Sequence, residues 1–159
     1  MKTNDIAKQI LKKYWDKNLP VNLTKLAADL KASVIPDPKL DVGGISGQFA
    51  LEKDGAVIRF NPHEPPVRQR FTIAHELGHY VLGHGDKFRD PLRNFSTSNY
   101  DPNEVAANRF AGAILMPEIA VEYWVISQGI TDLRTLAEKF DVSEVAMQYR
   151  LKNLGLISS

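Results

Sequence analysis

The feature that most constrains this chain is a run of five residues, His75-Glu76-Leu77-Gly78-His79, which matches the pattern H-E-x-x-H. On a helix, residues four apart lie one turn above each other on the same face, so both imidazoles can reach one metal ion. Glu76 points about 100° away around the helix, so it can stand beside such an ion without binding it. The pattern therefore predicts a helix that carries a metal-dependent hydrolytic centre.

The flanking residues favour a buried helix. Apolar side chains recur at roughly helical spacing around the motif, at Phe71, Ile73, Ala74, Leu77, Val81 and Leu82. Two histidines and a glutamate in such a helix need partners, because an unpaired buried polar group costs on the order of 1 to 3 kcal/mol. One metal ion satisfies all three side chains together. The alternative, a pair of core histidines bonded to backbone carbonyls, leaves Glu76 without a role.

Composition limits the choice of metal ligands. The chain has 159 residues and no cysteine, so it can bury a core without disulfides, and its ligands must come from His, Asp and Glu. The net charge of +1 does not indicate a nucleic-acid binder. The first residues lack a hydrophobic signal region, and no apolar run approaches the ~18 residues of a membrane span. We expect a soluble, cytoplasmic protein.

Two helices are predicted before the motif. Apolar residues at helical spacing indicate the first over residues 4–17, with Asn4 as its cap. Asn22 can cap the second, which is expected to stop before Pro36. Both helices are expected to cover a sheet.

Residues 45–60 predict a β-hairpin. Two β-rich segments flank Asp54-Gly55, a dipeptide that favours a turn with positive φ, and glycines at 43, 44 and 47 indicate a bulge or a close backbone approach. The first strand of this hairpin has two interpretations. It can be an edge strand that pairs with an extended substrate peptide, or it can simply close a small sheet.

A long loop and a second buried helix are expected after the motif. Residues 86–100 are polar and without period, so we predict a mobile loop that lines or covers a site. The helix begins at Asp101-Pro102 and ends at Met116-Pro117. Its many small residues allow a close approach to the H-E-x-x-H helix.

A third ligand must complement the two histidines, which supply half of a tetrahedral site. Glu104 is the preferred candidate, because it lies on the second buried helix with Asn108 one turn later. A different role for Glu104 is that of a capping-box glutamate. Position 85 is Gly, so the third histidine of the metzincin pattern is absent. The other acids considered as ligands are Glu118, Glu122, Asp86 and Asp90.

The C-terminal segment has a helix-turn-helix pattern. Helices are predicted over residues 132–140 and 144–153, with Ser143 as the cap of the second. Residues 131–159 hold four basic and four acidic side chains, 4 − 4 = 0, which disfavours binding to a DNA duplex. We therefore expect packing or partner docking here. The predicted division is a metal-site domain, residues 1–125, and a C-terminal subdomain, residues 126–159.

Several segments together resemble the ImmA/IrrE-type zinc metallopeptidases, a gluzincin-like family. The likeness covers most of the chain from about residue 20, and its main segments are Arg70-Phe71-Thr72-Ile73-Ala74-His75-Glu76-Leu77-Gly78-His79, Glu104-Val105-Ala106-Ala107-Asn108-Arg109-Phe110-Ala111 and Leu115-Met116-Pro117. The resemblance implies zinc on His75, His79 and Glu104, with Glu76 as the general base. Ala106 stands where many members carry a second acid, so Glu104 is the only ligand candidate in its segment.

The resemblance also implies a fold and an activity. The expected fold is α+β, a zincin-like domain with a small sheet packed on helices. The implied activity is that of a zinc-dependent endopeptidase that cleaves a separate protein, a phage-type helix-turn-helix repressor, and so releases genes of a mobile element or a stress response. Asn108 is expected to accept the outer N–H of one ligand histidine. The candidates for stabilising the oxyanion are His84, Tyr80, Tyr100 and His63.

Two rival interpretations remain at this point. In the first, the same zinc-containing fold binds a repressor or DNA as a regulatory protein without turnover. In the second, the zinc is structural and His84 fills the fourth coordination position. The sequence does not predict an oligomeric state or an activating signal.

Overall fold

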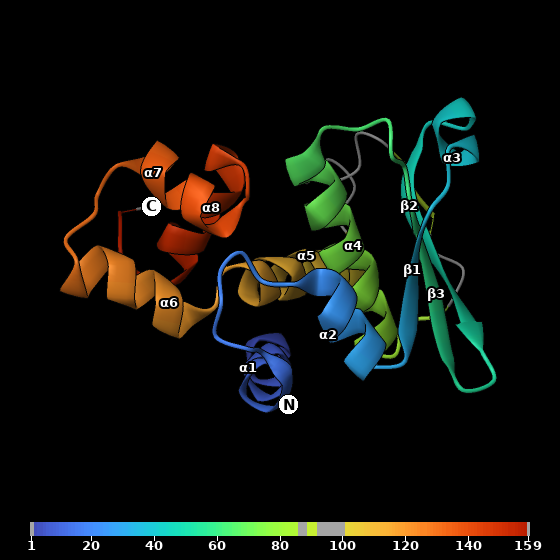
Figure 1. The fold of residues 1–159 in the computed structure, drawn as a ribbon, viewed down its shortest axis with the longest axis horizontal. Helices are drawn as coiled ribbons and strands as arrows, with labels where there is room; N and C mark the ends of the chain where they lie inside the picture. The colour runs from blue at the N-terminus through green and yellow to red at the C-terminus, as the bar shows by residue number, and fades with distance from the viewer. Residues whose placement is uncertain (1, 86–88, 92–100, 159) are drawn as a thin grey trace.

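The structure, a computed structural model, describes residues 2–85, 89–91 and 101–158, and it combines a small sheet with a larger set of helices (Figure 1). The α+β class expected from the sequence is confirmed. The elements in chain order are α1 (Thr3–Tyr14), α2 (Leu23–Asp29), β1 (Ala32–Pro36), α3 (Lys39–Val42), β2 (Ile45–Glu52), β3 (Gly55–Phe60), α4 (Pro66–Val81), β4 (Arg89–Pro91), α5 (Pro102–Leu115), α6 (Glu118–Glu122), η1 (Tyr123–Ser127), α7 (Leu133–Phe140) and α8 (Glu144–Asn153).

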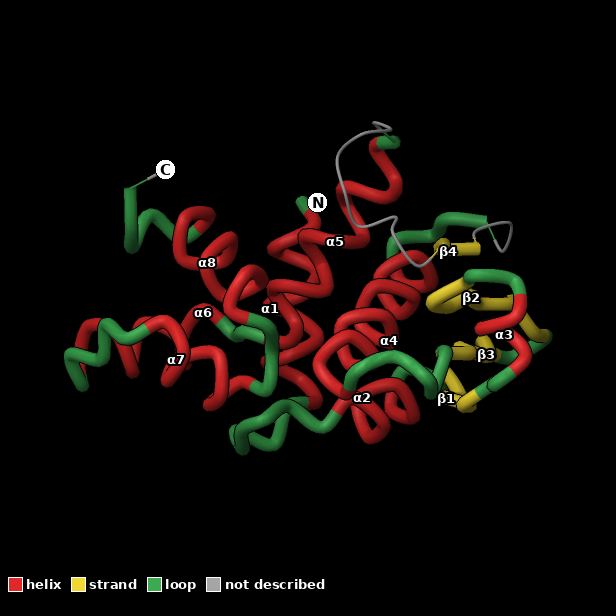
Figure 2. The backbone as a smooth tube through the Cα atoms, turned by 90° about the horizontal axis from the view of Figure 1, so that it is seen from above, coloured by secondary structure: helices red, strands yellow, loops and turns green. Residues whose placement is uncertain are grey.

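The described strands form one mixed sheet in the order β1-β3-β2-β4. β1 runs parallel to β3, while β2 runs antiparallel to both β3 and β4. Helix α4 lies against this sheet, and α5 packs on the other side of α4 (Figure 2). The H-E-x-x-H helix is therefore the middle layer, between the sheet and the second buried helix.

The apolar core follows these layers from the sheet to the C-terminal helices. Its largest fully buried apolar side chains include Phe49, Ile58, Leu77, Phe110, Ile114, Phe140 and Met147. No single helix in the described ranges is long and apolar enough to span a bilayer. By length and composition, only the bent pair Pro102–Leu115 and Glu118–Ser127, with 55° between its parts, meets that requirement.

The N-terminal half differs from the sequence prediction, since α1 packs mainly on α5 rather than on the sheet and α3 was not predicted. Helix α1 starts at Thr3 with Lys2 at the N-cap, so Asn4 is not its cap. Asn22 does cap α2, accepting a hydrogen bond from the backbone N–H of Lys25 at 3.0 Å. Strand β1 was not predicted. It has only five residues, and its partner β3 lies far along the chain, so neither its length nor a local turn signal identifies it.

The predicted hairpin is confirmed, but its glycine has another purpose. Glu52 pairs with Gly55, so the two turn residues are Lys53 and Asp54, and Gly55 does not have a positive φ. A Cβ on Gly55 would instead collide with the carbonyl oxygen of Lys31. Glycine is needed there because the hairpin passes close to the turn before β1.

The predicted loop over residues 86–100 contains a strand in its described part. β4 pairs antiparallel with β2 over Ile45–Gln48, with a bulge between Ile45 and Gly47. This corrects the loop prediction and decides between the two interpretations of the first hairpin strand. Residues 89–91 are a strand, and β2 is not an open edge along this stretch, because β4 already occupies its outer side. The bulge expected from the glycines is present.

Two arginines connect the C-terminal helices to the rest of the fold. Arg70 on α4 donates hydrogen bonds to the carbonyl oxygens of Val21 at 3.1 Å and Asp141 at 3.2 Å. Arg150 on α8 is 7% exposed and donates from Nε to the carbonyl of Met116 at 3.0 Å. Charged donors thus satisfy carbonyls at the ends of α5 and α7. The division of the chain at residue 125 stays a prediction.

The bonds of Arg70 predict a stability effect. Replacing Arg70 with alanine removes two charge-assisted hydrogen bonds and leaves their carbonyl acceptors without that donor. The free energy of unfolding should therefore fall by about 2 kcal/mol. Urea unfolding of both proteins measures the difference. Arg134→Ala is the matched control, because Arg134 is exposed and pairs only at 3.5 Å with Glu138. Equal losses in both variants would contradict a special role for Arg70.

Candidate metal centre

Helix α4 carries the motif in its most buried part. The helix begins at Pro66, a residue suited to the first helical position, and every side chain from Thr72 to His79 is buried. His75 and His79 lie one turn apart, and their rings meet edge to face with centroids 4.7 Å apart. Both Nε2 atoms point to the same place, since they are 3.1 Å from each other.

Gly78 allows α5 to approach this face closely. A Cβ on Gly78 would lie 3.1 Å from Cδ1 of Phe110 and 3.2 Å from both Cα and O of Ala107. Such distances are tighter than nearly all Cβ contacts, so any larger residue would push the helices apart. Ala107 is itself small and fully buried. The two small residues set the spacing that lets a side chain of α5 reach the histidines.

Glu104 is the side chain that reaches them. Its Oε2 lies 3.1 Å from Nε2 of His75, and its Oε1 lies 2.8 Å from Nε2 of His79. One ligand atom from each of these three residues falls within 4.8 Å of the others. A tetrahedral zinc with bonds of ~2 Å spaces its ligands ~3.3 Å apart, so two imidazole nitrogens and a carboxylate oxygen at these separations fit a metal ion.

The capping role considered for Glu104 is not seen among the described contacts. Asp101 caps α5 with its own side chain, accepting from the backbone N–H of Asn103 at 2.8 Å, and Pro102 follows it as predicted. The carboxylate of Glu104 faces the two histidines, and its side chain is 12% exposed. Its position in the first turn of α5 thus places an acid beside α4.

Asn108 holds the outer nitrogen of one histidine. Its Oδ1 lies 2.8 Å from Nδ1 of His75. Because an amide oxygen only accepts, Nδ1 of His75 must carry the proton, and the lone pair of Nε2 then faces the site. This is the contact expected for Asn108 from the sequence. Since Asn108 is one turn after Glu104, a single face of α5 supplies both side chains.

His84 makes the corresponding contact with the other histidine. Its Nδ1 lies 2.8 Å from Nδ1 of His79, the nitrogen that points away from Glu104. This contact puts His84 behind His79, on the side away from Glu104, so it does not support either role considered for His84 in the sequence. Burial, followed by the nearby ring of His79, lowers the pKa of His84. The sequence signal for this position of His84 is the glycine just before it. Gly83 has a φ of +78°, which turns the chain back after α4 ends.

Glu76 lies between α4 and the sheet. It is fully buried, and its Cγ is 3.3 Å from the point that a Cβ on Gly47 would occupy. The same Cβ would collide with Cγ2 of Thr72, so glycine at the β2 bulge makes room for this face of α4. Phe49 of β2 stacks on His79 with ring centroids 5.9 Å apart. The bulged strand therefore forms the wall beside Glu76.

The remaining candidate residues lie elsewhere or outside the described residues. The Tyr80 hydroxyl donates to the carbonyl of Leu30 at 2.9 Å, which directs it away from the histidines. His63 is exposed and does not belong to the group of possible metal ligands. Glu118 forms an ion pair with Lys8 at 2.8 Å. Glu122 is exposed. Asp86 and Tyr100 lie outside the described residues, and only the backbone of Asp90 is described.

This arrangement defines a class of protein: a zincin-like fold whose H-E-x-x-H helix meets a glutamate on the next buried helix. The model of the IrrE N-terminal-like domain matches residues 35–152, most of the chain, and the chain belongs to this family of metallopeptidases. The resemblance found in the sequence is thereby confirmed. The match includes α4, α5 and nearly all of α8.

Two curated relatives carry the name radiation response metalloprotease IrrE. The protein from Deinococcus radiodurans is 35% identical over 106 residues, which is 64% of this chain and 32% of the relative. The protein from Deinococcus deserti is 34% identical over 110 residues, 63% of this chain and 39% of the relative. The matched part of the chain thus spans 32% of one relative and 39% of the other, less than half of either.

A solved structure shares the fold. A Mycobacterium tuberculosis transcriptional regulator superposes with a TM-score of 0.62 and 21% identity, covering 94% of this chain and 46% of that chain. Identity at this level supports the architecture only. The metal-site chemistry therefore depends on the residues described above and on the family.

The contact at Gly78 predicts a coupling between helix spacing and metal affinity. Gly78→Ala should move α5 by a few tenths of an ångström, cost about 1 kcal/mol or more, and weaken zinc binding by about tenfold or more. Chelator competition measures zinc affinity, and urea unfolding of the metal-free protein measures stability.

Gly112→Ala is the matched control. Gly112 also lies in a helix, but the nearest neighbour of an added Cβ, Met116 Cε, is at an ordinary 3.8 Å. Alanine there should stabilise the protein by about 0.5 to 1 kcal/mol and leave zinc affinity unchanged. If both variants behave alike, the Gly78 contact does not set the spacing of α4 and α5.

Proposed function

We propose that this chain is a zinc-dependent endopeptidase, with His75, His79 and Glu104 as the metal ligands and Glu76 as the general base. The observation that carries this proposal is the convergence of the two Nε2 atoms with both carboxylate oxygens of Glu104, at 2.8 to 3.1 Å. Membership in the family supports the metallopeptidase class. Zinc is favoured because an N₂O donor set of two imidazoles and one carboxylate is typical of catalytic zinc sites.

The chemistry assigns Glu76 a proton-transfer role. Zinc, when bound, supplies Lewis-acid chemistry by acidifying water and polarising the scissile carbonyl. Glu76 follows a ligand in the chain but projects to a different side of α4, so its carboxylate can take the proton of the attacking water. It then holds that proton and delivers it to the leaving amine. Burial of Glu76 keeps bulk water from competing for the proton.

The outer contacts of the histidines orient the ligands for this task. Asn108 fixes the Nδ1–H tautomer of His75, and His84 contacts Nδ1 of His79 and so orients that ring. Phe49 and Phe71 stack on the two rings and limit their rotation. The carboxylate of Glu104 therefore meets two imidazoles whose Nε2 atoms are already held toward it.

The substrate we infer is a specific protein, a phage-type helix-turn-helix repressor located in the cytoplasm with the enzyme. This inference rests on the family resemblance described for the sequence. Two relatives are named as radiation response metalloproteases, which accords with a regulatory protease rather than a digestive one. Cleavage of the repressor would release the genes that it controls.

The ligand assignment is tested by zinc content. The purified protein should bind about one zinc per chain, and Glu104→Ala or His79→Ala should weaken binding sharply, because each removes one of three ligands. Glu118→Ala is the control: it removes an acid that pairs with Lys8 away from the histidines. Unchanged zinc affinity in Glu104→Ala would assign the third ligand to another acid.

The base assignment is tested by Glu76→Gln. Glutamine keeps the size and polarity of the side chain but cannot accept the proton. Cleavage of a candidate repressor should fall by ~10²-fold to 10⁴-fold while zinc content and fold persist. Cleavage is followed by gel electrophoresis and zinc is assayed in the same samples.

The same variant separates the enzyme from its rival. If wild type and Glu76→Gln bind a captured repressor equally well and neither cleaves it, the protein is a regulatory binder rather than a protease. Cleavage by Glu76→Gln at the wild-type rate would show that another group is the base. Capture with Glu76→Gln, which holds the substrate without cutting it, is the way to identify the partner.

A further inference from the structure

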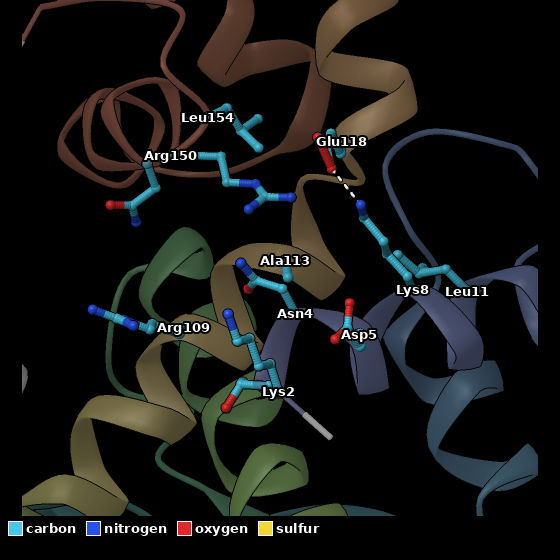
Figure 3. A pocket seen from close by; sticks show the side chains of 12 residues that line it. Lys2, Asn4, Asp5, Lys8, Leu11, Arg109, Ala113, Glu118, Arg150 and Leu154 are labelled. Carbon is cyan, nitrogen blue, oxygen red and sulfur yellow. Dashed lines mark ion pairs between the residues drawn. The ribbon is translucent and has the colours of Figure 1, made fainter.

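A second polar site lies away from the metal centre, in a cleft between the N-terminal and C-terminal helices. The cleft has a volume of about 760 Å³ and is lined from α1, α5, α8 and the start of α6. Figure 3 shows Arg150 reaching from α8 toward Glu118 and Lys8, while Lys2 and Asn4 enter from the start of α1. None of the proposed metal-site residues lines it.

The cleft carries a positive charge. Its basic lining residues are Lys2, Lys8, Arg109 and Arg150, and its acidic ones are Asp5 and Glu118. Lys8 and Glu118 neutralise each other in an ion pair at 2.8 Å. The remaining three cations and one acid give 3 − 1 = +2. The chain as a whole has a net charge of only +1. The +2 of the cleft is therefore a local excess of positive charge that the rest of the chain offsets.

Arg150 supplies oriented donors there. The residue is 7% exposed, and its Nε is fixed by the carbonyl of Met116 at 3.0 Å. Among the described contacts, no hydrogen bond uses either terminal nitrogen of this guanidinium, and the residue lines the cleft. A buried guanidinium held at one nitrogen presents the planar fork that binds phosphate oxygens in pairs.

The start of α1 supplies a second, independent set of donors. This 12-residue helix has Lys2 at its N-cap and no side-chain capping bond. Asp5 and Ile6 donate their backbone N–H groups to the carbonyl of Lys2, whereas Thr3 and Asn4 come before these bonds and line the cleft. The first N–H groups of a helix, with the positive end of its dipole, are a known anion-binding arrangement.

We propose that this cleft is a binding site for a small phosphate-bearing molecule. The phosphoryl oxygens would accept hydrogen bonds from the Arg150 guanidinium and from the first turn of α1, with Lys2 and Arg109 adding charge. The cleft volume falls within the ~300 to 1,000 Å³ of small-molecule sites and exceeds the size of a bare anion, which favours an organic phosphate. This proposal does not depend on the proposed peptidase activity.

A ligand bound in this cleft would connect three helices. It would hold α1 and α8 against α5, on the side of α5 away from its contact with α4. Arg109 directly follows Asn108, the residue that contacts His75, but points ~100° away around the helix. Binding should therefore raise the melting temperature of the protein whether or not zinc is present.

The test uses the full chain and three probes: inorganic phosphate, pyrophosphate and a nucleoside triphosphate, at constant ionic strength. Calorimetry and thermal shift should show binding, with a sub-millimolar Kd for at least one probe. The double variant Lys2→Gln and Arg109→Gln, which leaves Arg150 and its packing intact, should bind about tenfold more weakly or worse. The order of the three affinities distinguishes a free phosphate from a nucleotide as the source of the ligand.

Arg134→Gln with Lys17→Gln is the control, since both residues are exposed, lie outside the cleft and change the net charge equally. This control should keep the wild-type Kd for each probe. The proposal is wrong if no probe binds at ~10 mM, or if the control loses as much affinity as the cleft variant. Tight binding of duplex DNA that the cleft variant abolishes would also overturn it, in favour of a nucleic-acid site.

Discussion

The close contact between Gly78 of α4 and Ala107 of α5 is the constraint on which the candidate metal centre depends. Helix axes usually pack 8 to 10 Å apart, and the side chains at the crossing set the value. Here an added Cβ would already lie 3.2 Å from the Ala107 backbone. A glutamate in the first turn of α5 reaches α4 only because the crossing is this tight. Gly78 is therefore as necessary for the packing as the two histidines are for the proposed metal binding.

The same packing also orients the proposed ligands. Asn108 lies one turn after Glu104, so one face of α5 supplies both an inner carboxylate and the acceptor for the outer nitrogen of His75. Any shift of α5 would therefore disturb the position of Glu104 and the tautomer of His75 together. His84 belongs to the chain just after α4, so its contact with His79 does not depend on α5. The two histidines are thus oriented by separate elements.

Sequence reasoning succeeded where the signals are local. The motif, the cap at Asp101 and the small-residue helix α5 follow from spacing and capping chemistry, and together they placed Glu104 beside the histidines. It failed where pairing is distant: β1 joins a strand more than twenty residues later, and β4 has three residues. The role of Gly55 was misjudged for the same reason, because the carbonyl that excludes its Cβ belongs to Lys31, outside the hairpin.

The C-terminal helices have a helix-turn-helix pattern, yet part of their positive charge is used inside the protein. Residues 131–159 contain four basic side chains. Arg150 is buried against the carbonyl of Met116, and the Lys139 ammonium lies 3.8 Å from the centre of the Trp124 ring. Each phosphate neutralised on a duplex contributes about −0.9 to the slope of log affinity against log salt, so a face with two cations committed elsewhere offers little of the attraction that drives DNA binding. Arg70 of α4 donates a hydrogen bond to the carbonyl of Asp141 at the end of α7, so α7 and α8 help to support the H-E-x-x-H helix. Packing therefore explains the helix-turn-helix pattern better than DNA binding does, because Arg150 is buried and lines the cleft beside α1.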